Sequence, residues 1–278
     1  MPLPTENKTP SDNIADYTIL ICGEKNTGKT SLAAQFPNHF IFEFEPGNAK
    51  HLACVYEDCP DLKTFEHWLK EAEKDSTPRT IVIDEIQKLY DLCLERLLKE
   101  EGVDDPMDLN WGKGYKRIAT YFNRYITRLQ ALPGGNIYTA HCEYKEMETR
   151  KGRKITKITP KFGAEVTRLK DKQLHICGMI MFAEDGTRDF YLQGDDLIEA
   201  SCKLLDNHFY YIAESNKRSI AKFPMGANAV EAYDNFTKAF ANKLSVPDDF
   251  YVPIQNLTKK PKDLKKQENK KAQAFEIM

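Results

Sequence analysis

The chain has 278 residues, of which 29% are charged and 41% are hydrophobic, and its formal net charge is −2. These proportions are ordinary for a globular protein, so they exclude a disordered chain, and the length suits one α/β domain with a smaller appendage. No segment has the pattern of a signal peptide or of a bilayer-spanning run, and the seven cysteines form neither a C-x-x-C pair nor a zinc-like spacing with histidine. We therefore expect a cytoplasmic protein with reduced thiols and without a membrane partner.

Residues 1–16 are polar and contain three prolines, which predicts a flexible N-terminus. An apolar strand at 17–22 leads directly into residues 23–30, which fit the pattern G-x-x-x-x-G-K-[ST], and a helix is expected from Ser31. This context favours a phosphate-binding loop over a glycine turn beside a surface lysine, because glycine lets successive backbone N–H groups point at phosphate oxygens. The sequence therefore predicts a site for ATP and Mg²⁺. The residues expected to hold the nucleotide are Gly23, Glu24, Lys25, Asn26, Thr27, Gly28, Lys29, Thr30 and Ser31.

Helical and strand patterns alternate after this loop. The predicted strands lie at 40–45, 80–85, 136–141, 173–182 and 188–193. The predicted helices lie at 61–75, 86–100 and 115–131. The alternation predicts an α/β fold with a three-layer core around a mostly parallel sheet, and the last two strands are expected to add an antiparallel edge.

The C-terminal part has a different character. Residues 195–257 show helical spacing, clearest at 228–244, and predict a helical extension to a core domain at 17–194. Residues 258–278 are rich in lysine and have little to bury, which predicts a disordered tail. Residues 259–278 carry a net charge of +4, so the remainder carries −6. Such a tail either adds affinity for DNA or only keeps the protein in solution.

Five residues are candidates for the chemistry. We expect Lys29 to place its charge at the β- and γ-phosphates, and Thr30 and Asp84 to hold Mg²⁺. The alternative role of Asp84 is to cap the next helix. Hydrolysis also needs a carboxylate that orients and deprotonates water. Glu45, which ends the second predicted strand, and Glu85, directly after Asp84, compete for this catalytic role, and either can instead be a solvated strand end.

Several short stretches occur in the order found in a known family. They are Phe42–Gly47 (FEFEPG), Ile81–Asp84 (IVID), Trp111–Gly114 (WGKG) and Ile137–His141 (IYTAH). With the glycine loop, the chain from Tyr17 to Gln193 resembles the phage-encoded RecA-like ATPases of the AAA family, some of which act in single-strand DNA annealing. The resemblance implies a RecA-like P-loop NTPase core and favours Glu45 as the base, whereas the Asp–Glu pair is the arrangement of AAA-type ATPases and favours Glu85. It also implies that His141 senses the γ-phosphate, although a core histidine is the alternative.

A basic segment follows the strand that ends at His141. Between Tyr144 and Lys161 it has seven Lys or Arg residues against two glutamates. In RecA-like proteins this place holds a mobile loop that follows single-stranded DNA, and flexible cations suit the neutralisation of phosphates. The alternative is a solvated β-hairpin that turns at Lys151 and Gly152. The candidate DNA-binding residues are Lys145, Arg150, Lys151, Arg153, Lys154, Lys157 and Lys161.

The leading hypothesis is therefore an ATPase that acts on single-stranded DNA in phage recombination or replication. The resemblance implies a homo-oligomeric ring or filament, in which Arg188, Arg168, Lys170 or Lys172 reaches the γ-phosphate of a neighbouring subunit. A phage single-strand-binding or recombination protein is a further expected partner. Two alternatives stay open: an AAA-type motor or helicase loader that uses Glu85, and a nucleotide-binding interaction protein that hydrolyses little.

Overall fold

The computed structural model describes residues 9–109, 113–148, 152–183, 185–213 and 216–253. Within these residues, ten strands form one mixed sheet in the order β12-β8-β7-β1-β5-β4-β2-β3, with β6 beside β5 and β9 beside β7. The strands are β1 (Thr18–Gly23), β2 (His39–Glu43), β3 (Tyr56–Asp58), β4 (Thr80–Asp84), β5 (Asn136–Glu148), β6 (Lys154–Pro160), β7 (Ile176–Phe182), β8 (Arg188–Tyr191), β9 (Ser201–Cys202) and β12 (Lys222–Pro224). The run of strands from β7 to β3 in this order (β7, β1, β5, β4, β2 and β3) is parallel throughout, whereas β6, β8, β9 and β12 pair antiparallel. The predicted α/β fold is confirmed.

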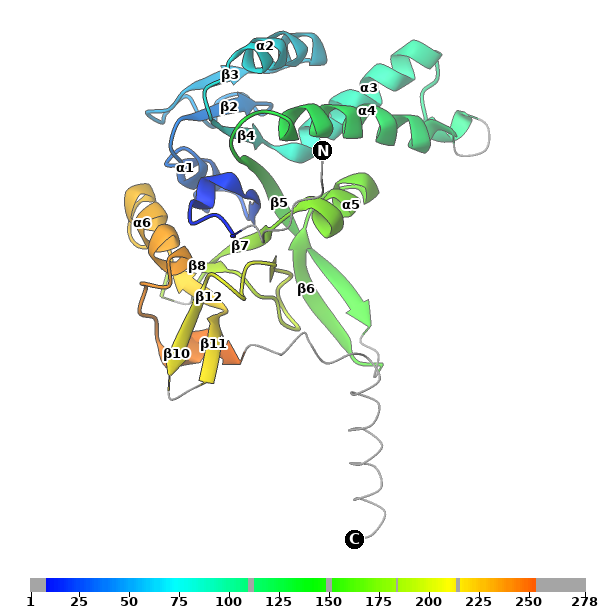
Figure 1. Cartoon of the computed structure of the whole chain (residues 1–278). Helices are drawn as coiled ribbons and strands as arrows, with labels where there is room; N and C mark the ends of the chain where they lie inside the picture. The colour runs from blue at the N-terminus through cyan, green and yellow to red at the C-terminus, as the bar shows by residue number, and fades with distance from the viewer. Residues whose placement is uncertain (1–8, 110–112, 149–151, 184, 214–215, 254–278) are drawn as a thin grey trace, which may run out of the picture.

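Helices cover both faces of the sheet and complete three layers (Figure 1). One face carries α2 (Leu62–Lys74), α3 (Ile86–Glu101), α4 (Lys113–Gln130) and α5 (Ala164–Gln173), and the other carries α1 (Lys29–Ala33) and α6 (Ala229–Phe240). Strand β1 contributes Leu20 to the first face and Ile19 and Ile21 to the second. Successive side chains of a strand point to opposite faces, so a strand that is apolar throughout needs cover on both sides.

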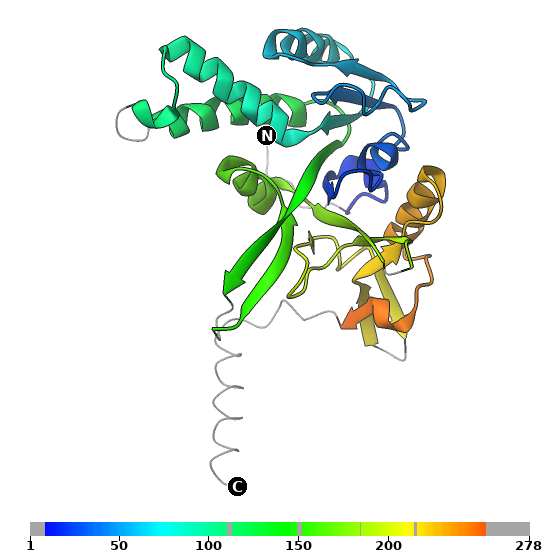
Figure 2. The same ribbon diagram turned by 180° about the vertical axis from the view of Figure 1, so that it is seen from behind.

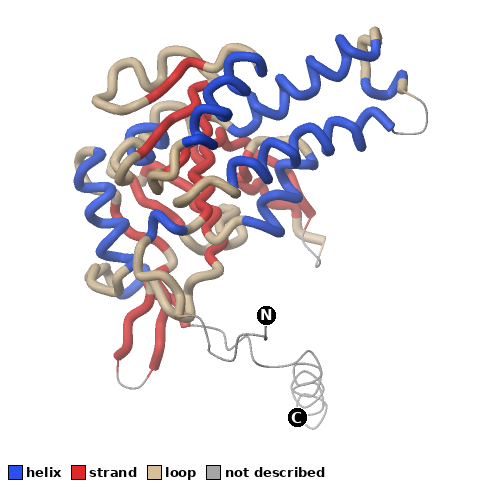
Figure 3. Tube along the Cα trace, turned by 45° about the horizontal axis from the view of Figure 1, so that its top comes forward, coloured by secondary structure: helices blue, strands red, loops and turns tan. Residues whose placement is uncertain are grey.

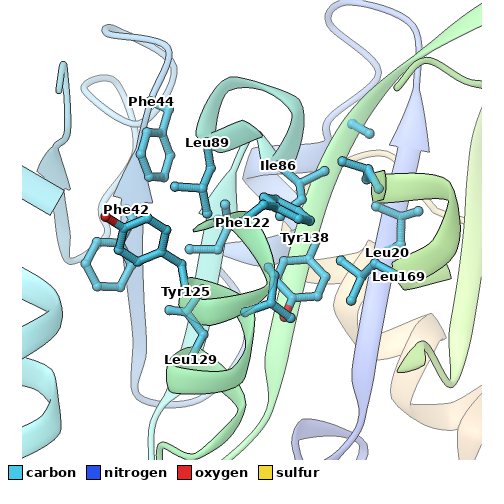
Figure 4. Close-up of a cluster of buried hydrophobic side chains, with 14 of the residues drawn as sticks. Leu20, Phe42, Phe44, Ile86, Leu89, Phe122, Tyr125, Leu129, Tyr138 and Leu169 are labelled. Atoms are coloured by element: carbon cyan, nitrogen blue, oxygen red, sulfur yellow. The ribbon is translucent and has the colours of Figure 1, made fainter. Parts of the chain in front are cut away.

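Aromatic side chains fill the core between the sheet and helices α2 to α5 (Figure 4). Phe42 of β2 meets Phe65 of α2 edge to face, with ring centroids 5.1 Å apart, and Phe65 meets Tyr125 of α4 at 5.4 Å. Tyr138 of β5 is fully buried in the same core. Each such side chain contributes about 2 kcal/mol through burial, so the core holds the ends of β2, β4 and β5 in a fixed arrangement.

The helices predicted at 61–75, 86–100 and 115–131 are confirmed as α2, α3 and α4, and α1 confirms the helix expected from Ser31. Figure 3 shows the helices in blue, and the ends of α2 and α3 follow local rules. The side chain of Asp61 accepts a 2.7 Å hydrogen bond from the N–H of Thr64 at the start of α2. Gly102 ends α3 with a φ of 63°, a conformation that favours glycine. Strand β3 and helix α5 were not predicted, because β3 has three residues and α5 is polar along most of its length.

The prediction of a helical extension at 195–257 is wrong except at 228–244, where α6 confirms the helix. Among the other described residues of this range there is no α-helix, and short strands joined by loops replace the expected helices. Strands β10 (Tyr210–Ala213), β11 (Asn216–Ile220) and β13 (Tyr251–Pro253) form a small antiparallel sheet, while β12 joins the main sheet beside β8. Phe223 of β12 stacks on Phe190 of β8 with centroids 5.2 Å apart, and both rings contact Phe236 of α6. This shared core is why a boundary at residue 194 does not separate two units.

The predicted flexible N-terminus is also wrong in part. Residues Ile14–Asp16 form a 3-10 helix, η1, because burying Ile14 and Ala15 in the second core fixes this turn. Residues 1–8 and the predicted disordered tail at 258–278 lie outside the described residues. In the part of the chain that the structure describes, no helix combines the length and apolarity needed to cross a membrane.

Candidate active site

The glycine loop, Asp84 and His141 meet at one edge of the sheet. Strand β5 lies between β1 and β4 and runs parallel to both, with Gly23 paired to His141 in the register. Strand β2 pairs with β4 so that Glu43 lies beside Asp84. Because the carboxyl ends of parallel strands share one edge, segments far apart in the sequence present their last residues to the same space.

The glycine loop closes around the Lys29 side chain. Gly28 has a φ of 95°, which is open to glycine, and it precedes α1 directly. The buried Lys29 Nζ donates to the backbone oxygens of Gly23 at 3.2 Å and Glu24 at 2.8 Å. Burial lowers the pKa of Lys29, whereas Asp84 and Glu85 oppose that effect. A desolvated cation whose two shortest hydrogen bonds go to neutral carbonyl oxygens is well suited to a phosphate group.

Asp84 is held by two hydroxyl groups. Thr30 Oγ1 donates to Asp84 Oδ2 at 2.6 Å, and Thr139 Oγ1 donates to Asp84 Oδ1 at 2.5 Å. A hydroxyl and a carboxylate at the end of the glycine loop are the oxygen ligands that Mg²⁺ prefers, directly or through water, so these residues fit the ion. Asp84 therefore faces the loop rather than capping α3. Sequence reasoning missed Thr139, although its place two residues before His141 on β5 was a usable signal.

Glu45, Glu85 and His141 form a cluster beside Lys29. One ligand atom from each lies within 4.8 Å of the others, and His141 Nε2 is 3.6 Å from both Glu45 Oε2 and Glu85 Oε2. The backbone N–H of His141 donates to Glu85 Oε2 at 3.1 Å, and His141 Nδ1 is 3.5 Å from Lys29 Nζ. Burial and then the nearby Glu45 raise the pKa of Glu85 to about 7. Burial and Lys29 lower the pKa of His141.

These residues line one cavity of about 270 Å³. Its walls are Lys25, Asn26, Gly28, Lys29, Thr30, Ser31, Glu45, Asn48, His51, Asp84, Glu85, His141 and Arg188. The structure thus brings together the residues predicted for the nucleotide, the metal and catalysis, with Gly23, Glu24 and Thr27 in the same loop. His141 has a side chain that is 32% exposed and faces the cavity, so its alternative as a core histidine is wrong. Asn48 and His51 were not predicted.

Arg188 lies against the glycine loop of its own chain. Its Nη1 donates to the backbone oxygen of Thr27 at 3.3 Å, and its Nη2 donates to that of Ala227 at 3.4 Å. From the sequence, Arg188 was one of four candidate cations for contact with the γ-phosphate of a neighbouring subunit. In the structure it lines the cavity beside the glycine loop of its own chain.

The basic segment after His141 is a regular hairpin as far as it is described. Strand β5 continues to Glu148 and pairs antiparallel with β6, from Cys142 opposite Pro160 to Glu148 opposite Lys154. Figure 2 shows this hairpin extending away from the sheet. The prediction of a flexible loop is therefore wrong for 144–148 and 154–161, because backbone pairing orders these residues. Arg150 and Lys151 lie outside the described residues.

The hairpin cations differ in their surroundings. Lys145 and Lys157 lie directly opposite each other in the register. Lys145 Nζ is 2.7 Å from Glu143 Oε1, and Lys157 Nζ donates to the backbone oxygen of Asp195 at 2.8 Å. Arg153, Lys154 and Lys161 are exposed near the turn and at the base. Like charges directly opposite on two strands repel, and here each lysine side chain has a separate acceptor.

A contact joins the hairpin to the glycine loop. Tyr144, whose residue is 61% exposed, donates its hydroxyl to Glu24 Oε1 at 2.6 Å. The backbone oxygen of the same Glu24 accepts from Lys29. Glu24 thus contacts Lys29 through its backbone oxygen and the hairpin through its side chain. Sequence reasoning placed Glu24 in the loop but gave no signal for this contact.

Comparison with known proteins gives one family. The family model described as an AAA domain matches residues 15–224, which is more than half of the 278 residues. The matched range includes the glycine loop, Asp84, Glu85, His141 and the hairpin, and it extends past residue 194 to the end of β12. A comparison with curated proteins gives no match.

Proposed function

Because this chain belongs to the AAA-domain family, whose members bind nucleotides and are generally ATPases, we propose that it hydrolyses Mg²⁺-ATP while acting on single-stranded DNA. One observation supports the ATPase part above all. Lys29 and Thr30 of the glycine loop and Asp84 at the end of β4, which are far apart in the sequence, converge on one cavity with 2.5–2.6 Å contacts around Asp84. This is the arrangement that positions a phosphate chain and its metal ion.

Within this proposal the chain's own groups bind and orient the nucleotide. The loop amides and Lys29 hold the phosphates, and Lys29 Nζ exchanges its contacts with the oxygens of Gly23 and Glu24 for phosphate oxygens. Thr30 and Asp84 hold Mg²⁺, which supplies charge neutralisation at the β- and γ-phosphates when bound. Thr139 keeps Asp84 oriented through its 2.5 Å hydrogen bond.

We assign the water-activating base to Glu85 rather than to Glu45. The Glu85 carboxylate is buried and is fixed by the N–H of His141, next to the carboxylate that would hold the metal. Glu45 is 31% exposed and also lies 4.0 Å from Lys88. A base fixed in place on the γ-phosphate side needs less reorganisation than an exposed one. This assignment replaces Glu45, the base that the RecA-like resemblance favours. His141, which lies between the two carboxylates, keeps its expected role as the sensor of the γ-phosphate.

The hairpin supports the DNA part of the proposal. Its described cations, Lys145, Arg153, Lys154, Lys157 and Lys161, extend from the strand end that carries His141. Phosphate neutralisation needs cations along a surface rather than a pocket, and Tyr144 adds an exposed ring on which a base can stack. We further propose a homo-oligomer that works with a phage single-strand-binding or recombination protein. A reducing cytoplasm suits the seven free thiols.

A second candidate is an AAA-type motor or helicase loader. The Asp84–Glu85 pair at the end of β4 and the family match favour it. The two candidates share the ATPase chemistry and differ in what stimulates it.

The decisive experiment measures the ATPase rate of the full chain with and without single-stranded DNA, and with Lys29→Ala and Asp84→Asn as reference variants. We expect DNA to raise the rate, Lys29→Ala to lack nucleotide binding, and Asp84→Asn to lose Mg²⁺-dependent turnover while still binding ATP in EDTA. An ATPase rate that does not change with DNA but rises when a helicase is added would favour the helicase loader. A wild-type protein that does not hydrolyse ATP under either condition would refute the enzymatic proposal.

A further inference from the structure

Arg188 reaches the glycine loop from the side of β1 that carries no catalytic carboxylate. It is the first residue of β8, which runs antiparallel to β7, so it lies at the same sheet edge as the loop. The sheet order places β7 and β8 on one side of β1, and β5 and β4 on the other. His141, Asp84 and Glu85 therefore approach the cavity from the opposite side to Arg188.

This opposition determines which phosphate Arg188 can meet. The metal and the γ-phosphate belong beside Thr30, Asp84 and Glu85, and the loop amides enclose the β-phosphate between the two sides. The phosphate that remains, on the Arg188 side, is the one attached to the nucleoside. The guanidinium also lies close to the loop, since a Cβ on Gly28 would be 2.8 Å from Nη1.

The guanidinium has unused capacity for an anion. Its two backbone contacts are long, at 3.3 and 3.4 Å, and each uses one of several N–H groups. Among the residues that the structure describes, no carboxylate forms an ion pair with it, although it lines the cavity that holds Lys29. Planar guanidinium groups pair well with phosphate oxygens, and such charge-assisted bonds are among the stronger ones.

We propose that Arg188 binds the α-phosphate of the nucleotide held by its own chain. This inference rests on the proposed nucleotide binding and goes beyond it by assigning the nucleoside end of the site. It differs from the role expected from the sequence, in which a cation serves the γ-phosphate of a neighbouring subunit. ATP, ADP and AMP share the α-phosphate, so the residue acts on all three equally and contributes to binding rather than to the chemical step.

The first test compares equilibrium binding of ATP, ADP and AMP to the wild type, Arg188→Ala and Arg188→Lys. We expect Arg188→Ala to weaken all three nucleotides by the same factor, about tenfold, whereas an AMP affinity that does not change would assign Arg188 to the β-phosphate and overturn the inference. Arg188→Lys should lose less, again equally, because it keeps the charge without the planar fork. The lysine variant also provides a result if the alanine variant does not fold. Lys63→Ala, which removes an exposed cation on α2, is the matched control and should bind as the wild type does.

Steady-state ATPase kinetics distinguish binding of the chain's own nucleotide from action on the γ-phosphate of a neighbouring subunit. For Arg188→Ala we expect KM for ATP to rise about tenfold while kcat stays within about twofold, because uniform binding is lost. Mixing Arg188→Ala with Lys29→Ala subunits should restore nothing. Unchanged ATP and ADP affinity, or a lower kcat that the mixture rescues, would overturn the inference. A wild type that binds neither nucleotide would refute the proposed function itself.

Discussion

Strand β5 joins two regions that are stabilised in different ways. Its first five residues, 136–140, are buried between β1 and β4 and covered by helices, whereas residues 142–148 pair with β6 alone and become exposed. His141, which pairs with Gly23 of β1, lies at the boundary between the two halves. The buried half is held by two neighbouring strands and a core, but a hairpin held by one partner is marginal by itself. Substitutions in the hairpin should therefore leave the positions of the cavity residues unchanged. The hairpin itself should depend on its contacts with the rest of the molecule, such as that of Tyr144 with Glu24.

This comparison orders the expected effects of substitutions. Changes at the buried end remove groups whose positions nothing else can supply, so they should cost orders of magnitude in rate. Changes along the hairpin remove exposed charges one at a time, so they should produce graded, salt-dependent effects.

The largest effect is expected for the base. Glu85→Gln should retain ATP binding and lower kcat by about 10²–10⁴-fold, the range that a positioned base contributes. Glu45→Gln removes a more exposed carboxylate and should lower kcat by less than about tenfold. Single-turnover hydrolysis with pre-bound ATP measures both. The reverse order of the two variants would contradict the assignment of Glu85 and restore the RecA-type arrangement.

The features that the sequence could predict are those that depend on neighbouring residues in the chain. The glycine loop, Asp84 and the strands 80–85 and 136–141 were predictable, because each depends on local patterns: glycine spacing, apolar runs and strand-end carboxylates. The contact of Thr139 with Asp84 and the location of Arg188 depend on strand order, which local patterns do not contain. The C-terminal strands β10 to β13 were missed for the same reason. Their apolar residues pack against α6 and β8 rather than along a helix face of their own.

A second prediction concerns pH and the metal-free, nucleotide-free protein. The pKa of Glu85 is raised from 4.5 to about 7 in the folded state, first by burial and then by Glu45. The folded protein therefore binds the proton more tightly than the unfolded chain does. The stabilisation is present below about pH 4.5 and is lost as pH rises to about 7, with a total of about 3 kcal/mol. Glu85→Gln should remove this decline.

Urea unfolding at pH 5 and pH 8 in EDTA tests this. The free energy of unfolding of the wild type should fall relative to that of Glu85→Gln between the two pH values. The double variant with Glu45→Gln shows the share due to charge repulsion. Parallel pH profiles for the wild type and Glu85→Gln would mean that the Glu85 carboxylate ionises as easily in the folded protein as in the unfolded chain.

The third prediction addresses the exposed half of β5. Lys145→Ala with Lys157→Ala removes the directly opposed cations of the hairpin. If both contact phosphates of single-stranded DNA, the slope of log affinity against log salt should flatten by about 1.4, and basal ATPase should be unchanged. Fluorescence titrations at several salt concentrations measure the slope. The control is the double change Lys63→Ala and Lys70→Ala on α2, which lies far from the hairpin (Figure 1). Equal slopes for the wild type and the hairpin variant would mean that Lys145 and Lys157 do not contact DNA and that the hairpin is only a solvated surface.

The smallest effect is expected where the two regions touch. Tyr144→Phe removes the 2.6 Å hydrogen bond to Glu24 but keeps the ring. Basal ATPase should stay within about twofold and the free energy of unfolding within about 1 kcal/mol, because the contact is exposed. Since Lys29 must release the Glu24 carbonyl to meet a phosphate, nucleotide binding disturbs the residue that holds Tyr144.

The stimulation of ATPase by DNA should therefore fall a few-fold in Tyr144→Phe, as expected for a coupling free energy near 1 kcal/mol. Tyr144→Leu is the companion variant, because it also removes the ring and should weaken DNA binding, whereas Tyr144→Phe should not. The quantity to compare is the ratio of the DNA-stimulated to the basal rate at saturating DNA. If Tyr144→Phe keeps that ratio, the two halves of β5 communicate through His141 alone, and the contact with Glu24 only supports the base of the hairpin.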